Sequence, residues 1–329
     1  MFSLELPIDL QAALAPRLEQ ASQRELLAAA GEISARYRAR EPGTLLLRSE
    51  EEALAYALAR MPATYGAVSQ AAAWALEAAG PALGEGPFSL LDAGAGTGAA
   101  AWAMADRLPL SSVSCLEYSP AMRALGSALM RESGNAALRE ARWQQADLTA
   151  APRLEQAGLV TAAYVLNELP AEQALAAAEA LWQAAGRFLL LVEPGTPEGF
   201  GLLRQVRERL LSRGAFLAAP CPQDGPCPLP EGDWCHFACR VQRTRLHKLA
   251  KGGDAPFEDE KFTFLAFTRQ PPAPRPARIL RRPQIEKGRV SLRLCTRAGL
   301  AGRTVSKREG PRYKLARKAA WGGGFPEEE

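Results

Sequence analysis

The sequence predicts an α/β protein in which a doubly wound, mostly parallel sheet carries helices on both faces. Three observations predict this fold. A glycine-rich turn at residues 94–98 follows a short apolar run and precedes an alanine-rich helical segment. Apolar runs then alternate with helical segments as far as residue 213. Several runs end in an acidic or amide side chain, at the sheet edge where open α/β folds bind their ligands.

The first strand and its turn are the most informative element. The run SLLDAGAGTG at residues 89–98 predicts a buried strand that turns into a helix over 99–107. Glycines permit the tight turn, and the helix start offers free N–H groups to a ligand. An acid two positions before G-x-G-x-G is typical of the S-adenosylmethionine loop of class I methyltransferases. A dinucleotide fingerprint is the competing interpretation. We expect these residues to bind the methyl donor: Asp92, Gly94, Gly96 and Gly98.

The next two strands end in further candidate donor-binding acids. The second strand, over 111–117, ends in Glu117, the place from which a carboxylate binds ribose hydroxyls. Ser119-Pro120 then opens a helix over 120–132. The third strand, over 142–148, places Asp147 where class I enzymes recognise adenine. A solvated strand end for Glu117 and ordinary turn chemistry for Asp147 are the alternatives.

A fourth, almost wholly apolar strand over 159–166 ends in Asn167-Glu168-Leu169-Pro170. A helix over 171–185 and a strand over 187–192 follow it. Asn167 and Glu168 are the candidate catalytic residues, because they lie at the ligand-binding edge; capping of the next helix is the alternative. This segment lacks the aromatic residue with which base-modifying enzymes stack a flipped base, which weakens the case for base N-methylation.

Length and composition suggest how the chain is divided. With 329 residues, 47% of them hydrophobic, it has enough apolar material for a large core. We expect a helical N-terminal domain at 1–86, a donor-binding core at 87–214, a cysteine-rich insertion at 215–260, a basic C-terminal region at 261–322 and a tail at 323–329. No uncharged apolar run reaches 18 residues, so we expect a cytoplasmic protein without membrane contact, monomeric when free.

Charge is strongly segregated along the chain. Residues 269–321 hold 16 Lys and Arg against 2 Asp and Glu, whereas residues 1–268 carry a net charge of −7. A basic segment beside a weakly acidic body indicates a polyanionic partner, and interleaved aromatics favour nucleic acid over a membrane surface. The candidate RNA-binding residues are Arg281, Arg282, Lys307, Arg308, Arg312, Lys314, Arg317 and Lys318.

Four of the six cysteines, Cys221, Cys227, Cys235 and Cys239, lie within 19 residues of one another. In a chain expected to be cytosolic, such clustering indicates metal binding rather than disulfides. The spacing C-x5-C-x7-C is unlike zinc knuckles, whereas Cys-Pro steps are typical of iron–sulfur loops. Spacing alone leaves the fourth ligand open between Cys239 and Cys295, or His236 in a zinc site. Cys115 is expected to pack in the core.

Several motifs together resemble a known family. They are LDAGAGTG at 91–98, VLNEL at 165–169, EPGTPEG at 193–199, the cysteines at 221 and 227 with DWCHF at 233–237, KGG at 251–253, FEDEKF at 257–262, Cys295, and YKLARKAAWG at 313–322. This set is similar to the methyltransferase-like proteins associated with the mitochondrial small ribosomal subunit and to their bacterial relatives. The resemblance covers most of the chain.

The resemblance implies a 4Fe–4S cluster and binding to small-subunit ribosomal RNA during assembly. Carried over residue by residue, the ligands are Cys221, Cys227, Cys235 and Cys295. Cys239 departs from the family pattern. A ligand at 295 would join the basic C-terminal region to the body, so a structural cluster is favoured over a redox one. Strands over 262–268 and 290–296 are expected to complete the sheet.

Two functions remain open: an active methyltransferase, or an RNA-binding assembly factor that keeps the donor pocket without turnover.

Overall fold

The computed structural model describes residues 3–39, 47, 49–150, 152–251 and 253–327. In this part of the chain, nine strands form one sheet in the order β1-β8-β9-β6-β5-β2-β3-β4, with β7 also beside β9. Five consecutive strands of that order are mutually parallel. They are β2 (Phe88–Ala93), β3 (Leu110–Leu116), β4 (Arg142–Gln144), β5 (Ala157–Ala163) and β6 (Ala185–Pro194).

Helices cover both faces of this sheet because its strands are apolar on both sides. Along β2, Leu90 belongs to the core on one face and Leu91 to the core on the other. The first face packs against α4 (Met61–Ala79) and α5 (Ala99–Ala105). The second packs against α8 (Ala171–Ala184) and α9 (Pro197–Ser212). The predicted doubly wound α/β fold is confirmed.

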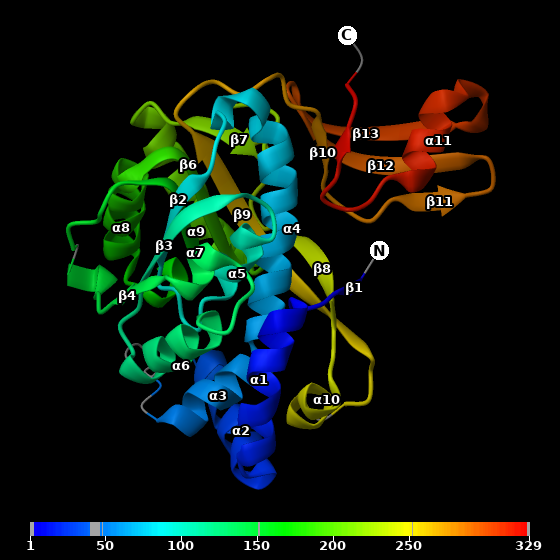
Figure 1. Ribbon diagram of the computed structural model, residues 1–329. Helices are drawn as coiled ribbons and strands as arrows, with labels where there is room; N and C mark the ends of the chain where they lie inside the picture. Colours follow the sequence, from blue (N-terminus) through cyan, green and yellow to red (C-terminus); the bar gives the residue numbers. More distant parts are fainter. Residues whose placement is uncertain (1–2, 40–46, 48, 151, 252, 328–329) are drawn as a thin grey trace.

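The remaining helices of the body lie mainly at the N-terminal end of the chain. They are α1 (Ile8–Gln20), α2 (Gln23–Ala39), α3 (Glu50–Ala59), α6 (Pro120–Met130) and α7 (Ala136–Arg139). Within the predicted N-terminal domain, α4 crosses the sheet face and contacts β6, β7, β8 and β9 (Figure 1). No described helix is long and apolar enough to cross a membrane.

The antiparallel side of the sheet is built from later segments. The long strand β9 (Phe257–Thr268) pairs with β6 along one edge. Its other edge is shared by β7 (Phe216–Ala219) and β8 (Phe237–Gln242), and β8 also pairs with β1 (Ser3–Leu4). A helix, α10 (Arg245–Lys251), connects β8 to β9. The predicted cysteine-rich insertion therefore begins and ends in strands of the main sheet.

A second sheet projects from the body as an arm, which we define as residues 277–325 (Figure 1). It contains β10 (Ala277–Ile279), β11 (Gln284–Glu286), β12 (Arg289–Thr296), β13 (Gly299–Ser306) and β14 (Gly324–Phe325), with α11 (Pro311–Lys318) against them. The expectation that 290–296 completes the main sheet is wrong, because β12 pairs with β10, β11 and β13 and buries its apolar side in the arm's own small core.

Two predicted strands are also shorter than expected. The third ends at Gln144, so Asp147 lies in a turn beyond it. The fourth ends at Ala163, and residues 166–168 form a short 3-10 helix. Polar side chains that bond to nearby backbone groups account for both endings.

Candidate donor site and cysteine cavity

The glycine loop between β2 and α5 has the backbone shape that its sequence predicts. Gly94, Gly96 and Gly98 have φ values of 66°, 58° and 88°, the left-handed region that favours glycine. A Cβ at Gly94 would lie 2.5 Å from Cγ2 of Val165, so this position has no room for a side chain. The loop therefore brings bare backbone to the carboxyl edge of the sheet, where a ligand can approach it closely.

Asp92 stabilises this loop through two hydrogen bonds. Its Oδ1 accepts a hydrogen bond from Thr161 Oγ1 at 2.8 Å, and its Oδ2 accepts one from the Ala101 backbone N–H at 3.2 Å. The side chain is 1% exposed, and this burial raises its pKa to about 7. Asp92 lines the loop cavity, but both of its oxygens already fix the turn and the start of α5.

Glu117 and Asp147 lie at the ends of neighbouring strands. Glu117 accepts hydrogen bonds from the backbone N–H groups of Gly96 (2.9 Å) and Ser119 (2.8 Å), which ties β3 to the glycine loop. Burial raises the pKa of Glu117, and these N–H groups oppose the rise. Asp147 accepts from the N–H and hydroxyl of Thr149 in its own turn. Ribose and adenine contacts by these two acids stay predictions.

The cavity at the loop includes residues that sequence reasoning missed. Tyr56 of α3 and Thr64 of α4 line it together with the glycines. The buried hydroxyls of Thr64 and Thr97 have no described hydrogen-bond partner. The cavity has a volume of about 20 Å³, which is room for one or two waters. The helices α3 and α4 thus contribute to the lining of this cavity. Their alanine-rich sequence carries no signal for this role.

The candidate catalytic residues do not line this cavity. Asn167 and Glu168 are both exposed. With its nitrogen facing inward, the Asn167 amide donates to Glu193 Oε2 at 2.7 Å and to the Tyr164 carbonyl at 3.2 Å. Glu193 also accepts from the Leu166 N–H, and burial raises its pKa to about 8. Asn167 therefore braces the chain after β5 instead of facing the donor loop.

Tyr164 is a third residue that the sequence does not reveal. It has φ 59°, a left-handed conformation that is strained for an aromatic residue. Its hydroxyl donates to Glu260 Oε1 at 3.0 Å, and the Arg60 guanidinium lies 6.0 Å from its ring centre. A strained tyrosine held from two sides thus lies immediately after β5, one residue beyond Ala163 of the donor cavity.

Four cysteines from separate segments line a second cavity. Cys221 follows β7, Cys227 and Cys235 lie in the loop before β8, and Cys295 belongs to β12 of the arm. The structure thus brings Cys295 to the other three, 60 residues beyond Cys235. Cys239 does not line this cavity; its sulfur lies 3.3 Å from where a Cβ on Gly66 of α4 would be.

Burial disfavours the thiolate form of three cysteines that line this cavity. Burial raises the pKa of Cys221 and Cys235, and that of Cys295 to about 12. Repulsion from the neighbouring thiolates adds to this effect for each of them. Within the described part of the chain, no group of three or more His, Cys, Asp or Glu is arranged to hold a single metal ion.

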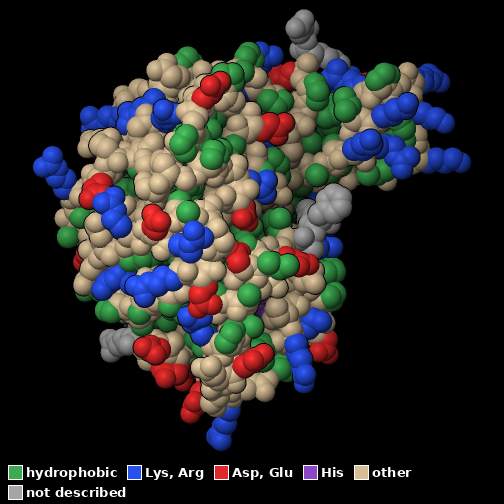
Figure 2. Space-filling view, in the orientation of Figure 1, with side chains coloured by type: hydrophobic (Ala, Val, Ile, Leu, Met, Phe, Trp, Pro, Cys, Tyr) green, Lys and Arg blue, Asp and Glu red, His purple; other side chains and the backbone are tan. Residues whose placement is uncertain are grey.

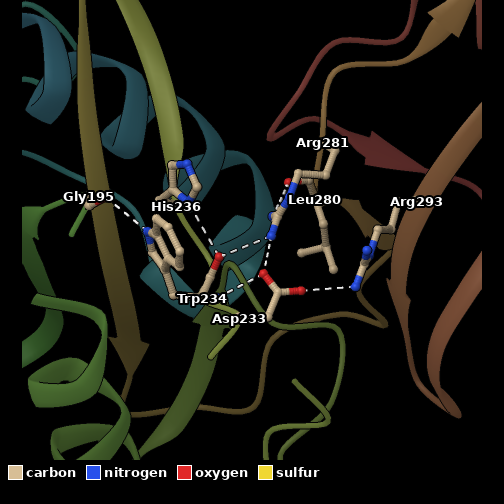
Figure 3. A network of polar contacts seen from close by, with 7 residues as sticks. All are labelled: Gly195, Asp233, Trp234, His236, Leu280, Arg281 and Arg293. Carbon is tan, nitrogen blue, oxygen red and sulfur yellow. Dashed lines mark hydrogen bonds and ion pairs between the residues drawn. The ribbon is translucent and has the colours of Figure 1, made fainter. Parts of the chain in front are cut away.

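A polar network holds the arm against the cysteine loop, which we define as residues 220–236 between β7 and β8 (Figure 3). Asp233 accepts hydrogen bonds from Arg281 through Oδ1 and from Arg293 through Oδ2, the latter at 2.9 Å. Trp234 Nε1 donates to the Gly195 carbonyl at 3.0 Å, and the His236 ring stacks on Trp234 with centres 5.0 Å apart. Asp233 precedes Cys235 by two residues and Arg293 precedes Cys295 by two. One carboxylate thus ties together the two segments that carry these cysteines.

The candidate RNA-binding residues fall into two groups. Arg281 pairs with Asp233 and Arg282 pairs with Asp259 at 3.0 Å, so both are engaged within the chain. Arg312 lies over the Phe325 ring and donates to the Pro326 carbonyl. The remaining five are exposed and have no carboxylate partner among the described residues. They are Lys307, Arg308, Lys314, Arg317 and Lys318. Basic side chains gather on the projecting arm (Figure 2).

The strand order, the antiparallel β9 and the glycine loop together define a class I methyltransferase-like protein. Residues 50–326 match the protein family described as mitochondrial small ribosomal subunit Rsm22. The chain belongs to this family.

Curated relatives share the family and differ in length. The human "Ribosome assembly protein METTL17, mitochondrial" is 31% identical over an alignment of 299 residues, which covers 84% of this chain and 63% of the relative. "Rsm22-cox11 tandem protein 2, mitochondrial" of Schizosaccharomyces pombe is 29% identical over an alignment of 216 residues, which covers 51% of this chain and 29% of the relative. The chain therefore spans less than two thirds of either relative.

Solved structures resemble the fold at low identity. Magnesium protoporphyrin IX methyltransferase from Synechocystis with bound SAM has a TM-score of 0.41 and 16% identity, covering 72% of this chain and 90% of that one. A putative RNA methyltransferase from Pyrococcus horikoshii has a TM-score of 0.37 and 14% identity, covering 60% and 81%. These likenesses concern the fold and bear on neither substrate nor activity.

The prediction of a cytoplasmic protein is wrong. The matched family and both relatives are mitochondrial by description, which points to the mitochondrion instead. Besides the absence of a long apolar run, the prediction used the absence, near residue 1, of a basic flank followed by an apolar core. That pattern marks secretory signals, whereas mitochondrial transit segments are amphipathic and rich in arginine, so the pattern does not test for them.

Proposed function

We propose that this chain is a ribosome assembly protein that binds small-subunit ribosomal RNA through its arm. In this proposal a 4Fe–4S cluster in the cysteine cavity fastens the arm to the main sheet, and the glycine loop holds S-adenosylmethionine. The observation that carries the proposal is the convergence of four thiols at the junction of arm and body. Cys221, Cys227 and Cys235 come from the segment between β7 and β8, and Cys295 comes from β12 of the arm.

The donor set fits an iron–sulfur cluster better than a zinc ion. The ligands would be Cys221, Cys227, Cys235 and Cys295, a set of four thiols such as cubane clusters use. The spacing C-x5-C-x7-C of the first three is unlike that of zinc knuckles, which have two to four residues between paired ligands. When bound, the cluster supplies four covalent links between segments that otherwise meet through side chains alone. Its proposed role is structural.

The exposed cations of the arm support RNA as the partner. Phosphate binding needs cations that are not already neutralised within the protein. The five exposed residues of α11 and the turn before it meet this condition, whereas Arg281 and Arg282 do not. We therefore assign the RNA contact to α11 and residues 307–308, and a positioning role to Arg281 and Arg282.

Methyl transfer is a second candidate function. Tyr164, strained and next to the donor cavity, favours it, because backbone strain of this kind is concentrated at functional sites. In that case the protein orients the donor and the acceptor for in-line displacement and excludes water. The inward bracing of Asn167 and the exposed Glu168 leave this activity without an assigned general base.

Crosslinking in cells followed by sequencing tests the proposal. The protein is expected to crosslink to small-subunit ribosomal RNA, and cells lacking it are expected to accumulate immature small subunits. Crosslinks spread evenly over cellular RNA would contradict the ribosomal assignment. Comparing methylation in the same cells separates the two functions. A missing methyl group that returns with the wild-type protein but not with Tyr164→Ala identifies an enzyme, and unchanged methylation identifies an assembly factor.

A further inference from the structure

We propose that Arg207 and Arg278 balance the charge of whatever fills the cysteine cavity, and that this occupant is a dianion. This inference rests on the proposed cluster and adds two residues that are not ligands. Both guanidinium groups line the cavity beside the cysteines, and both side chains are almost fully buried, at 3% and 4% exposure.

Arg278, in β10, is held by carbonyl groups. Its Nε donates to the Pro220 carbonyl at 2.9 Å and its Nη1 donates to the Gly322 carbonyl at 2.7 Å. Its guanidinium also lies 5.9 Å from the centre of the Trp74 ring. The two carbonyl groups accept hydrogen bonds from Arg278 and orient its guanidinium, but neither they nor the ring carries a formal negative charge. Glu77 attracts Arg278 from a distance without forming an ion pair.

Arg207, in α9, has fewer contacts still. Its Nη2 donates to the Gln223 carbonyl at 2.8 Å, and its buried Nε has no hydrogen-bond partner in the described part of the chain. It lines the cavity together with Cys221, one of the four proposed ligands. A buried donor without an acceptor indicates a missing partner on the cavity side.

Three other partly buried arginines of this protein pair with carboxylates. Arg243 pairs with Glu258, Arg275 with Asp224 and Arg281 with Asp233. Among the described residues, neither Arg207 nor Arg278 forms an ion pair with a carboxylate. A buried cation is strongly unfavourable unless an anion compensates it. The only groups at the cavity able to supply that charge are the thiols, once a metal centre deprotonates them.

The charges then balance. A 4Fe–4S core with a formal charge of 2+ and four thiolates carries a net charge of −2, which the guanidinium groups of Arg207 and Arg278 neutralise. A third arginine of the lining, Arg204, is paired with Glu208 at 3.8 Å. Cations beside such a cluster also stabilise its more negative, reduced state. Arg207 and Arg278 are therefore expected both to retain the cluster and to raise its reduction potential. Reduction here means that the core takes one electron from dithionite and becomes 1+, with the thiolates unchanged.

The test compares Arg207→Met and Arg278→Met with the charge-retaining variants Arg207→Lys and Arg278→Lys. The control is Arg269→Met. Arg269 also donates to backbone carbonyls and lies over a tryptophan ring, but it is remote from the cavity. Each full-length protein is purified without oxygen. The release of iron to a chelator is followed, and the potential is measured by dithionite titration with electron paramagnetic resonance.

Each methionine variant is expected to release iron at least tenfold faster than the wild type. At a fixed potential, we also expect a tenfold smaller ratio of reduced to oxidised cluster, which is a shift of about 59 mV for one electron. The lysine variants are expected to lie closer to the wild type than the methionine variants. If Arg278→Met does not fold, Arg207→Met decides the matter, because it removes a single described hydrogen bond.

Two failures are distinguishable. Wild-type protein without iron and sulfide would overturn the proposed cluster itself. Wild-type protein that loads normally, with methionine variants that match Arg269→Met in iron release and potential, would leave the cluster standing and overturn the charge-balancing role.

Discussion

The glycine loop and the cysteine cavity are built in opposite ways. The loop is made almost entirely by one continuous stretch, residues 92–100, whose backbone conformation follows from its glycines. The cavity is assembled from residues that span more than 80 positions and belong to both sheets. The loop offers bare backbone groups, whereas the cavity offers thiols and buried cations. A local motif can thus be read directly from sequence, while the cavity depends on how distant segments meet.

This contrast predicts where each site fails. Damage to the loop is expected to act through backbone strain and to remain local. Damage to the cavity is expected to release the arm, because Cys295 and Arg278 belong to the arm whereas the other cysteines belong to the body. The following predictions are ordered from the largest expected effect to the smallest.

Cys295→Ser is expected to have the largest effect. It removes the arm's one proposed ligand, so bound iron is expected to fall nearly to zero and backbone amides of β10 and β12 to exchange at least tenfold faster. Iron analysis and hydrogen exchange measure these changes. The matched control is Cys239→Ala, which removes a thiol that does not line the cavity. Equal iron loss in both variants would contradict the assignment of the fourth ligand.

Charge reversal on α11 is expected to weaken RNA binding next most strongly. Lys314→Glu, Arg317→Glu and Lys318→Glu together are expected to lower affinity roughly 100-fold, because about three phosphate contacts are lost. The slope of log affinity against log salt is expected to become shallower by about three. Titration of a small-subunit RNA fragment at several salt concentrations measures both quantities.

Two comparisons sharpen this prediction. The triple variant Arg24→Glu, Arg131→Glu and Arg153→Glu changes the net charge equally at exposed sites outside the arm, and is expected to bind RNA nearly as the wild type does. Arg281→Glu is expected to loosen the arm, since its partner is Asp233. An unchanged affinity in the α11 variant would refute the assigned RNA surface.

Gly94→Ala is expected to destabilise the loop by about 2–4 kcal/mol, because the new Cβ meets Val165 and the left-handed φ penalises a side chain. Urea unfolding measures the loss. Gly86→Ala is the control, with φ 97° and open space around the new Cβ. It therefore carries the conformational cost without the steric clash. Equal losses in the two variants would mean that the contact with Val165 contributes nothing.

The buried acids predict a modest pH dependence. Asp92 and Glu193 have pKa values raised to about 7 and about 8, above the values they regain on unfolding. The folded protein therefore binds more protons than the unfolded chain between about pH 4 and 8, so stability falls as pH rises through that range. Glu193→Gln is expected to reduce the slope by about 1 kcal/mol per pH unit. A series of urea titrations from pH 5 to 8 measures the slope, and an identical slope in the variant would contradict the raised pKa.

Much of the sheet could be predicted because its signals are local. Each parallel strand is a continuous apolar run next to a helical segment, and the turn after β2 is marked by its glycines. The last strands were harder to predict from the sequence. Residues 290–296 have the alternating pattern of a strand, but the pattern does not state which strand they pair with. Their pairing with β13 across a short turn leads them into the arm instead of the main sheet.

The two sites were also predictable to different extents, because sequence shows local motifs but not how distant segments meet. The four cysteines that line the cavity were identified by family resemblance, and their role as ligands stays a prediction. Arg207 and Arg278 carried no sequence signal, because burial without a carboxylate is a property of the folded chain. Arg281 and Arg282 resembled RNA contacts by charge alone, and only their carboxylate partners distinguish them from the exposed cations. Tyr164 was missed because its backbone conformation leaves no trace in sequence.

The central claim is that thiolates from the body and the arm share one iron–sulfur cluster. Analysis of iron and acid-labile sulfide in anaerobically purified protein tests it most directly. The account predicts about four iron and about four sulfide ions per chain, and a brown solution that absorbs at about 400 nm. A colourless protein with one zinc and no sulfide per chain would contradict it.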